Sequence, residues 1–71
     1  MDRYVVFTDV SKRDGIGIEF YVNDVLALEI FRNDATKTKT ISLYHEDFPL
    51  DKLKAYIAIF DKEIPSDFMS D

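Results

Sequence analysis

The sequence predicts an α+β fold: a four-stranded antiparallel meander with one C-terminal helix packed on one face, in the order ββββα. Segments rich in β-branched and aromatic residues recur through the first 45 residues, and polar turns with Gly, Asn or Asp separate them. One stretch of helical period then follows and ends before Pro65. The 71 residues are expected to form a single domain, 1–71, close to the size at which a core alone stabilises a fold.

The first two strands are expected at residues 3–8 and 16–22. The first reads RYVVFT, and a polar turn, DVSKRDG, follows it. The second alternates between two faces, as a half-buried strand does. Its apolar face carries Ile16, Ile18, Phe20 and Val22.

The third and fourth strands are expected at residues 25–32 and 39–45. If alternate apolar residues of both strands face the helix, one register satisfies both strands. That register pairs Ile30 with Ile41 and Leu28 with Leu43.

The second hairpin has two possible registers. A two-residue Asn-Asp turn sets Glu29 opposite Ile18 on the buried face. A longer loop or a β-bulge instead pairs Phe20 with Leu28 and sets Glu29 beside Glu19 on the outside. We favour the second, because burying a lone carboxylate costs several kcal/mol, roughly, whereas two exposed like charges cost less than about one.

The helix is expected at residues 48–64. Pro49 suits a first turn, and Asp51 and Lys62 match the helix dipole. The stripe expected to face the sheet consists of Leu50, Leu53, Ile57, Phe60 and Ile64. Strand and helix both span roughly 22 Å, so one helix is expected to cover one face of the sheet and leave the other uncovered.

The net charge is −5, which disfavours binding to a phosphate backbone and suits a basic protein surface. An acidic balance is also a common way to stay soluble. The chain contains no cysteine, no apolar run near the ~20 residues of a membrane span, and no signal-peptide pattern at its start. We therefore expect a cytoplasmic protein without a membrane segment.

The uncovered face is expected to display an aromatic and hydroxyl surface. Tyr21, Phe31 and Tyr44 lie on it, with Tyr4 and Val6 or their neighbours from the first strand. Tyr rings with polar tips recur at binding hot spots. The competing interpretation is that open sheets often expose Thr and Tyr because of their strand propensity.

The helix carries two further apolar residues, Tyr56 and Ile59, off its main stripe. Tyr56 can pack in the core, but Ile59 has no place there, so a partner surface is expected. Charges separate along the sheet. An acidic end gathers Asp24, Glu46, Asp47 and Asp51; a basic end gathers Lys12, Arg13, Arg32, Lys37 and Lys39.

Catalytic and metal motifs fail their context tests. Ser42 and His45 are separated by an odd number of strand positions and so face opposite ways. Gly15 and Gly17 precede a strand rather than a helix, unlike a nucleotide-binding loop. Asp9 and Asp14 lack the spacing of a calcium loop. No catalytic residue, cofactor or metal is expected.

The leading hypothesis is a small acidic, non-enzymatic protein-binding module. Its most specific form is an inhibitor or immunity-type protein that blocks a basic or catalytic surface of another protein. The expected anchors are Tyr21, Phe31, Tyr44, Tyr56 and Ile59, steered by the acidic end. The alternative is a homo-oligomeric scaffold module, such as a homodimer, without a separate target.

Overall fold

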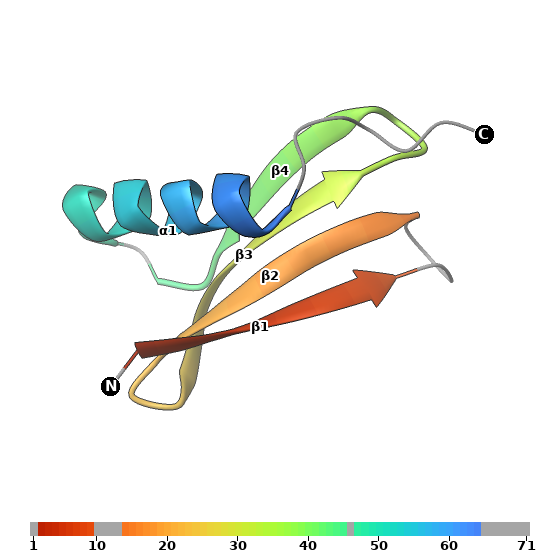
Figure 1. Ribbon diagram of the computed structural model, residues 1–71. Coiled ribbons are helices and arrows are strands. Elements are labelled where there is room, and N and C mark those ends of the chain that lie inside the picture. Colours follow the sequence, from red (N-terminus) through yellow and green to blue (C-terminus); the bar gives the residue numbers. More distant parts are fainter. Residues whose placement is uncertain (1, 10–13, 46, 65–71) are drawn as a thin grey trace.

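The computed structural model shows the predicted ββββα fold (Figure 1). It describes residues 2–9, 14–45 and 47–64. Consecutive strands are neighbours in one antiparallel sheet, ordered β1-β2-β3-β4, and the helix lies across one face. The elements are β1 Asp2–Asp9, β2 Gly15–Val22, β3 Val25–Asn33, β4 Thr38–Leu43 and α1 Leu50–Glu63.

The second hairpin combines both registers considered from the sequence. Asn23 and Asp24 form a tight turn with φ of 52° and 65°, as their tolerance of left-handed backbone predicts. A bulge then shifts the register between Phe20 and Tyr21. The shift restores the favoured pairs, Phe20 with Leu28, Ile18 with Ile30, and Glu19 with Glu29.

The core lies between α1 and the two central strands. It consists of Ile18, Phe20, Leu28, Ile30, Tyr56, Phe60 and Ile64. The predicted helical stripe is partly wrong, because the helix is turned toward β1. Tyr56 is buried and Ile59 packs against the core, whereas Leu50 and Ile57 are exposed.

Three side-chain contacts tie α1 to β1 and account for this rotation. The Tyr56 hydroxyl donates to Asp2 Oδ2 at 2.7 Å, and Lys52 Nζ lies 3.1 Å from the same oxygen. The Tyr4 hydroxyl donates to Glu63 Oε2 at 3.0 Å. Tyr4 and Val6 pair with Phe20 and Ile18, so they lie on the helix side, and of the two alternatives it is their neighbours, Val5 and Phe7, that lie on the open face.

The open face of the sheet is closed at its centre by two phenylalanine rings over two glycines. Phe7 and Phe31 stack with ring centroids 5.9 Å apart. A Cβ added to Gly17 would lie 2.7 Å from Phe31 Cδ1 and 2.9 Å from Phe7 Cζ. A Cβ added to Gly15 would likewise clash with the Arg32 carbonyl oxygen. Phe31 is therefore only 1% exposed, and its expected exposure is wrong.

The end of the sheet that bears the β3–β4 turn is less basic at its surface than the sequence predicts. Arg32 is buried, and its Nε lies 3.0 Å from Asp34 Oδ1. Lys37 and Lys39 are exposed, while Lys12 and Arg13 lie outside the described residues.

Within the described residues, no helix has the length and apolar character needed to span a membrane.

We predict that Gly17→Ala lowers the free energy of unfolding by about 1–3 kcal/mol, because the added methyl displaces the stacked rings. Chemical denaturation with urea measures the change. Ser42→Ala, exposed on the same face, is the control and should stay within about 0.5 kcal/mol of the parent. A Gly17→Ala variant as stable as the parent would contradict the close packing.

Candidate protein-binding surface

Three of the predicted anchors belong to the chain's own packing. Phe31 lies under Phe7, Tyr56 is buried in the core, and Ile59 is half-buried against that core. The helical wheel places Ile59 outside the core only if the stripe is centred on Ile57, and the contacts with β1 move that centre. We therefore do not assign these three to a partner surface.

Tyr56 connects the helix to β1. Its ring stacks on Phe20 with centroids 4.3 Å apart. Burial, followed by its bond to the Asp2 carboxylate, raises the pKa of Tyr56 to about 12. The same bond, with Lys52, lowers the pKa of Asp2 below its usual value.

Tyr21 and Asp24 are both held by Arg3. The Arg3 guanidinium carbon lies 4.2 Å from the centroid of the Tyr21 ring, and Arg3 Nε lies 3.4 Å from Asp24 Oδ1. The Tyr21 hydroxyl donates to Glu19 at 3.2 Å. Partial burial and this carboxylate raise the pKa of Tyr21. Tyr21 is thus half-covered, while Asp24 remains at the surface.

Of the residues predicted to bind a partner, those in the connection from β4 to α1 are among the most exposed. We define the corner surface as Tyr44, Asp47, Leu50 and Asp51. Tyr44 is 53% exposed and Leu50 is 62% exposed, and both carboxylates are exposed. Glu46, predicted to belong here, lies outside the described residues.

Local backbone geometry positions the corner surface. The Tyr44 amide donates to the Ala27 carbonyl at 2.9 Å, which fixes the chain as it leaves β4. Pro49, at φ −58°, then starts the helix, so that Leu50 falls on its first turn. The Asn23-Asp24 turn lies at this same end of the sheet (Figure 1).

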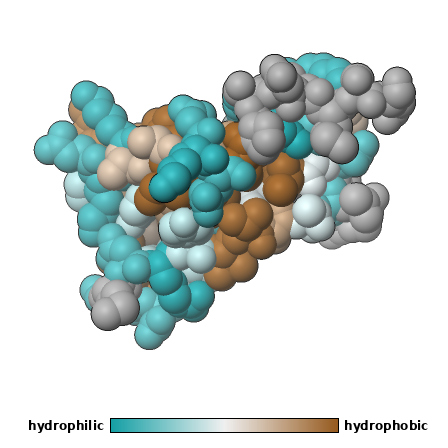
Figure 2. All heavy atoms as spheres, viewed as in Figure 1, coloured by the Kyte–Doolittle hydropathy of each residue, from teal (hydrophilic) through white to brown (hydrophobic). Residues whose placement is uncertain are grey.

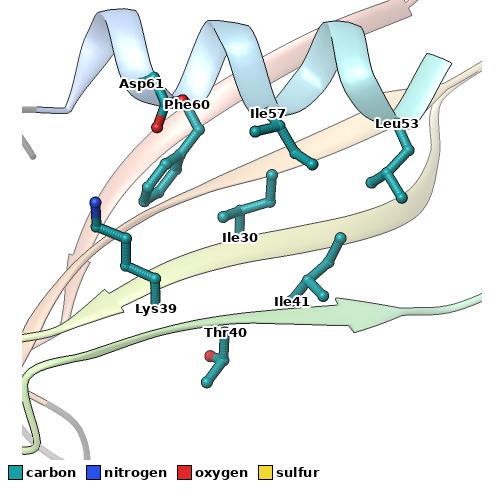
Figure 3. A pocket seen from close by; sticks show the side chains of 8 residues that line it. All are labelled: Ile30, Lys39, Thr40, Ile41, Leu53, Ile57, Phe60 and Asp61. Atoms are coloured by element: carbon teal, nitrogen blue, oxygen red, sulfur yellow. The ribbon is translucent and has the colours of Figure 1, made fainter. Parts of the chain in front are cut away.

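A second surface, which the sequence reasoning assigned to the core, lies between α1 and β4. We call it the edge groove, an open hollow of about 260 Å³. It is lined by Ile30, Lys39, Thr40, Ile41, Leu53, Ile57, Phe60 and Asp61. Ile57 and Leu53 point from the helix toward Ile30 and Ile41, and the Lys39 amine lies at one end (Figure 3).

The side chains that the edge groove leaves exposed come from both of its walls. Ile41 is 42% exposed and Ile57 is 43% exposed. The outer side of the helix is mostly hydrophilic (Figure 2). The sequence could have indicated this groove, because one helix is narrower than a sheet of four strands and leaves part of the sheet uncovered.

The backbone of β4 borders the groove as a strand edge. In an antiparallel ladder the amide and carbonyl groups alternate between the two sides of a strand. Since the Tyr44 amide points toward β3, those of Ser42 and Thr40 do too. The amide and carbonyl groups of Ile41 and Leu43 therefore point outward, away from the sheet.

The described residues contain no cluster of three His, Asp or Glu side chains that could hold a metal ion. What the corner surface and the edge groove offer is apolar contact area, carboxylates and strand-edge hydrogen bonds. These are the ingredients of protein–protein contacts.

Comparison with known proteins gave no match: no family model fits the sequence, and no curated protein or solved structure is significantly similar to it.

We predict that Tyr56→Phe alters the pH dependence of stability. Because the folded state raises the Tyr56 pKa from 10 to about 12, its contribution is fully present below pH 10 and is lost between pH 10 and 12. The Asp2 contribution runs the other way: it is lost as the pH falls through the lowered pKa of Asp2. Urea unfolding from pH 2 to 12 measures both limbs.

In Tyr56→Phe, both limbs should become shallower, and stability at pH 7 should fall by about 1–2 kcal/mol through loss of the hydrogen bond. Tyr44→Phe is the matched control, since Tyr44 is exposed, and it should reproduce the parent profile. Equal profiles for the parent and Tyr56→Phe would contradict the coupling between Tyr56 and Asp2.

Proposed function

We propose that this protein is a small non-enzymatic binding module that acts by covering a surface of another protein. The observation that carries the proposal is the corner surface, where the β4–α1 connection and the first helical turn expose two apolar side chains, Tyr44 and Leu50, and the carboxylates of Asp47 and Asp51. In most interfaces a few residues contribute most of the binding free energy, and aromatic anchors surrounded by a charged rim are typical.

The chemistry of the corner surface favours a basic target. Asp24 lies at the same end, and the whole chain carries a net charge of −5. Carboxylates around an apolar anchor attract Lys and Arg during encounter and then pair with them at the rim. In its most specific form the proposal is an inhibitor or immunity-type protein, whose acidic corner occupies a basic or catalytic cleft of its target.

The mechanism assigns separate roles to the two kinds of side chain. Asp47 and Asp51 accelerate association, an effect that salt screens. Tyr44 and Leu50 lose water on contact and set the dissociation rate. Inhibition then follows from occupancy alone, because the covered surface is closed to substrate.

The test is capture of a partner from the native host by the tagged protein at about 50 and 300 mM salt, followed by kinetics with the purified partner. We expect Tyr44→Ala to weaken binding about tenfold or more, mainly through faster dissociation. The double variant Asp47→Asn with Asp51→Asn should slow association at low salt and have little effect at high salt.

The matched controls lie elsewhere on the molecule. Val6→Ala removes an exposed apolar side chain from β1, and Asp14→Asn removes one exposed carboxylate at the other end of the sheet. Both should bind as the parent does. Absence of a salt-sensitive partner from a host that expresses the protein, or equal losses in the controls, would contradict the proposal.

A further inference from the structure

We infer that the edge groove and the edge of β4 bind a second copy of this chain, through antiparallel pairing of β4 with β4 about a two-fold axis beside Ile41. This interface shares Asp47 with the corner surface but does not depend on the proposed target. Three properties of the edge favour the second copy as its occupant: its hydrogen-bond pattern, its self-complementary side chains and the placement of its charges.

The hydrogen-bond pattern permits one central register. The outward amide and carbonyl groups belong to alternate residues, among them Ile41 and Leu43. Antiparallel pairing with Ile41 opposite Ile41 of the second copy lets these groups bond reciprocally. The two sheets then join into one of eight strands, and both β4 edges are covered.

The side chains are complementary under the same two-fold axis. Ile41 lies mid-strand and Ile57 mid-helix, and both line the edge groove at the same level (Figure 3). A two-fold axis at that level brings Ile41 against its equivalent and joins the two grooves, in which Ile57 forms part of the helical wall. The half-exposed Leu43, on the same face, then meets the Lys39 stem of the second copy.

The charges complement one another only in the antiparallel direction. Lys37 lies at the β3–β4 turn, and Asp47 lies past the other end of β4. Antiparallel pairing places Lys37 opposite residue 45 of the second copy, two positions from its Asp47. A parallel arrangement would place like charges together. Local attraction at both ends thus offsets the repulsion between two chains of net charge −5.

The other strand edge is less suited to pairing. β1 begins and ends with aspartate and carries Arg3, whereas Lys39 is the one charged residue of β4. Charged side chains along an edge are a common device against strand pairing. Asp2 and Tyr4 of β1 are also engaged by the helix.

The first test is sedimentation equilibrium of the full chain from about 5 to 200 μM. We expect a reversible dimer with twice the monomer mass. Ile57→Glu should raise the dimer dissociation constant at least tenfold. Val6→Glu, which makes the same change at the β1 edge, should leave it unchanged. A monomer at 200 μM, or greater loss in Val6→Glu, would overturn the inference.

The second test locates the interface by amide hydrogen exchange. The amides of Ile41 and Leu43 should be protected at 200 μM and exchange freely in the Ile57→Glu monomer, whose circular dichroism should remain that of the parent. A dimer in which these two amides exchange freely uses another surface, and this outcome would also overturn the inference.

The third test fixes the strand direction by charge reversal. Lys37→Glu and Asp47→Lys should each weaken the dimer, and the double variant should restore it, because attraction then returns at both ends. A double variant weaker than either single one would exclude antiparallel pairing. Because Tyr44 lies on the face of the sheet opposite Ile41, we expect Tyr44→Ala to weaken target binding and leave the dimer intact, and Ile57→Glu to do the reverse, so the two failures are measured separately.

Discussion

A single helix is narrower than a four-stranded sheet, and much of this molecule follows from that mismatch. A helix with its side chains is about 10–12 Å across, whereas strands lie about 4.8 Å apart, so α1 covers the two central strands and little more. The contacts of Tyr56 and Lys52 with Asp2 pull the helix toward β1. As a result, β4 keeps Ile41 and Leu43 half-exposed on the very face that the helix occupies.

On the other face the chain closes much of the sheet without a second layer. Because Gly17 lacks a Cβ, Phe7 and Phe31 can lie against the backbone and bury each other. Toward the start of β1, the Arg3 side chain covers the ring of Tyr21 on the same face. The exposed apolar side chains that we propose for binding therefore lie at the corner surface and along the edge of β4 rather than at the centre of the open face.

The fold was predictable because each element carries its own signal: alternation in the strands, turn residues between them, and one helical period. All four strands and the helix lie within two residues of the predicted bounds. The register was predictable, since the alternative sets Glu29 opposite Ile18 on the helix face. In the observed register Glu29 lies beside Glu19 on the open face, although it is buried there rather than exposed as expected. The environment of the proposed binding residues was less predictable. The side-chain period alone could not reveal the bond of Tyr56 to Asp2, 54 positions away, or the ring packing that Gly17 permits. Among the predicted binding residues that the structure describes, Tyr44, Asp24, Asp47 and Asp51 are exposed as expected, and Tyr21 is half-covered on its expected face.

The corner surface and the edge groove have different chemistry and share no lining residue, although Asp47 of the corner surface also takes part in the proposed pairing of β4. Tyr44 follows Leu43 and lies on the open face, while Ile41 of β4 and Ile57 of α1 line the edge groove on the helix side. Pairing through β4 would therefore carry two corner surfaces on one rigid eight-stranded sheet. A target with two basic sites at that spacing would be held far more tightly than by one corner, because the second contact becomes intramolecular. A target with one site would gain nothing from the dimer, so the dependence of affinity on dimerisation reports how many sites the target presents.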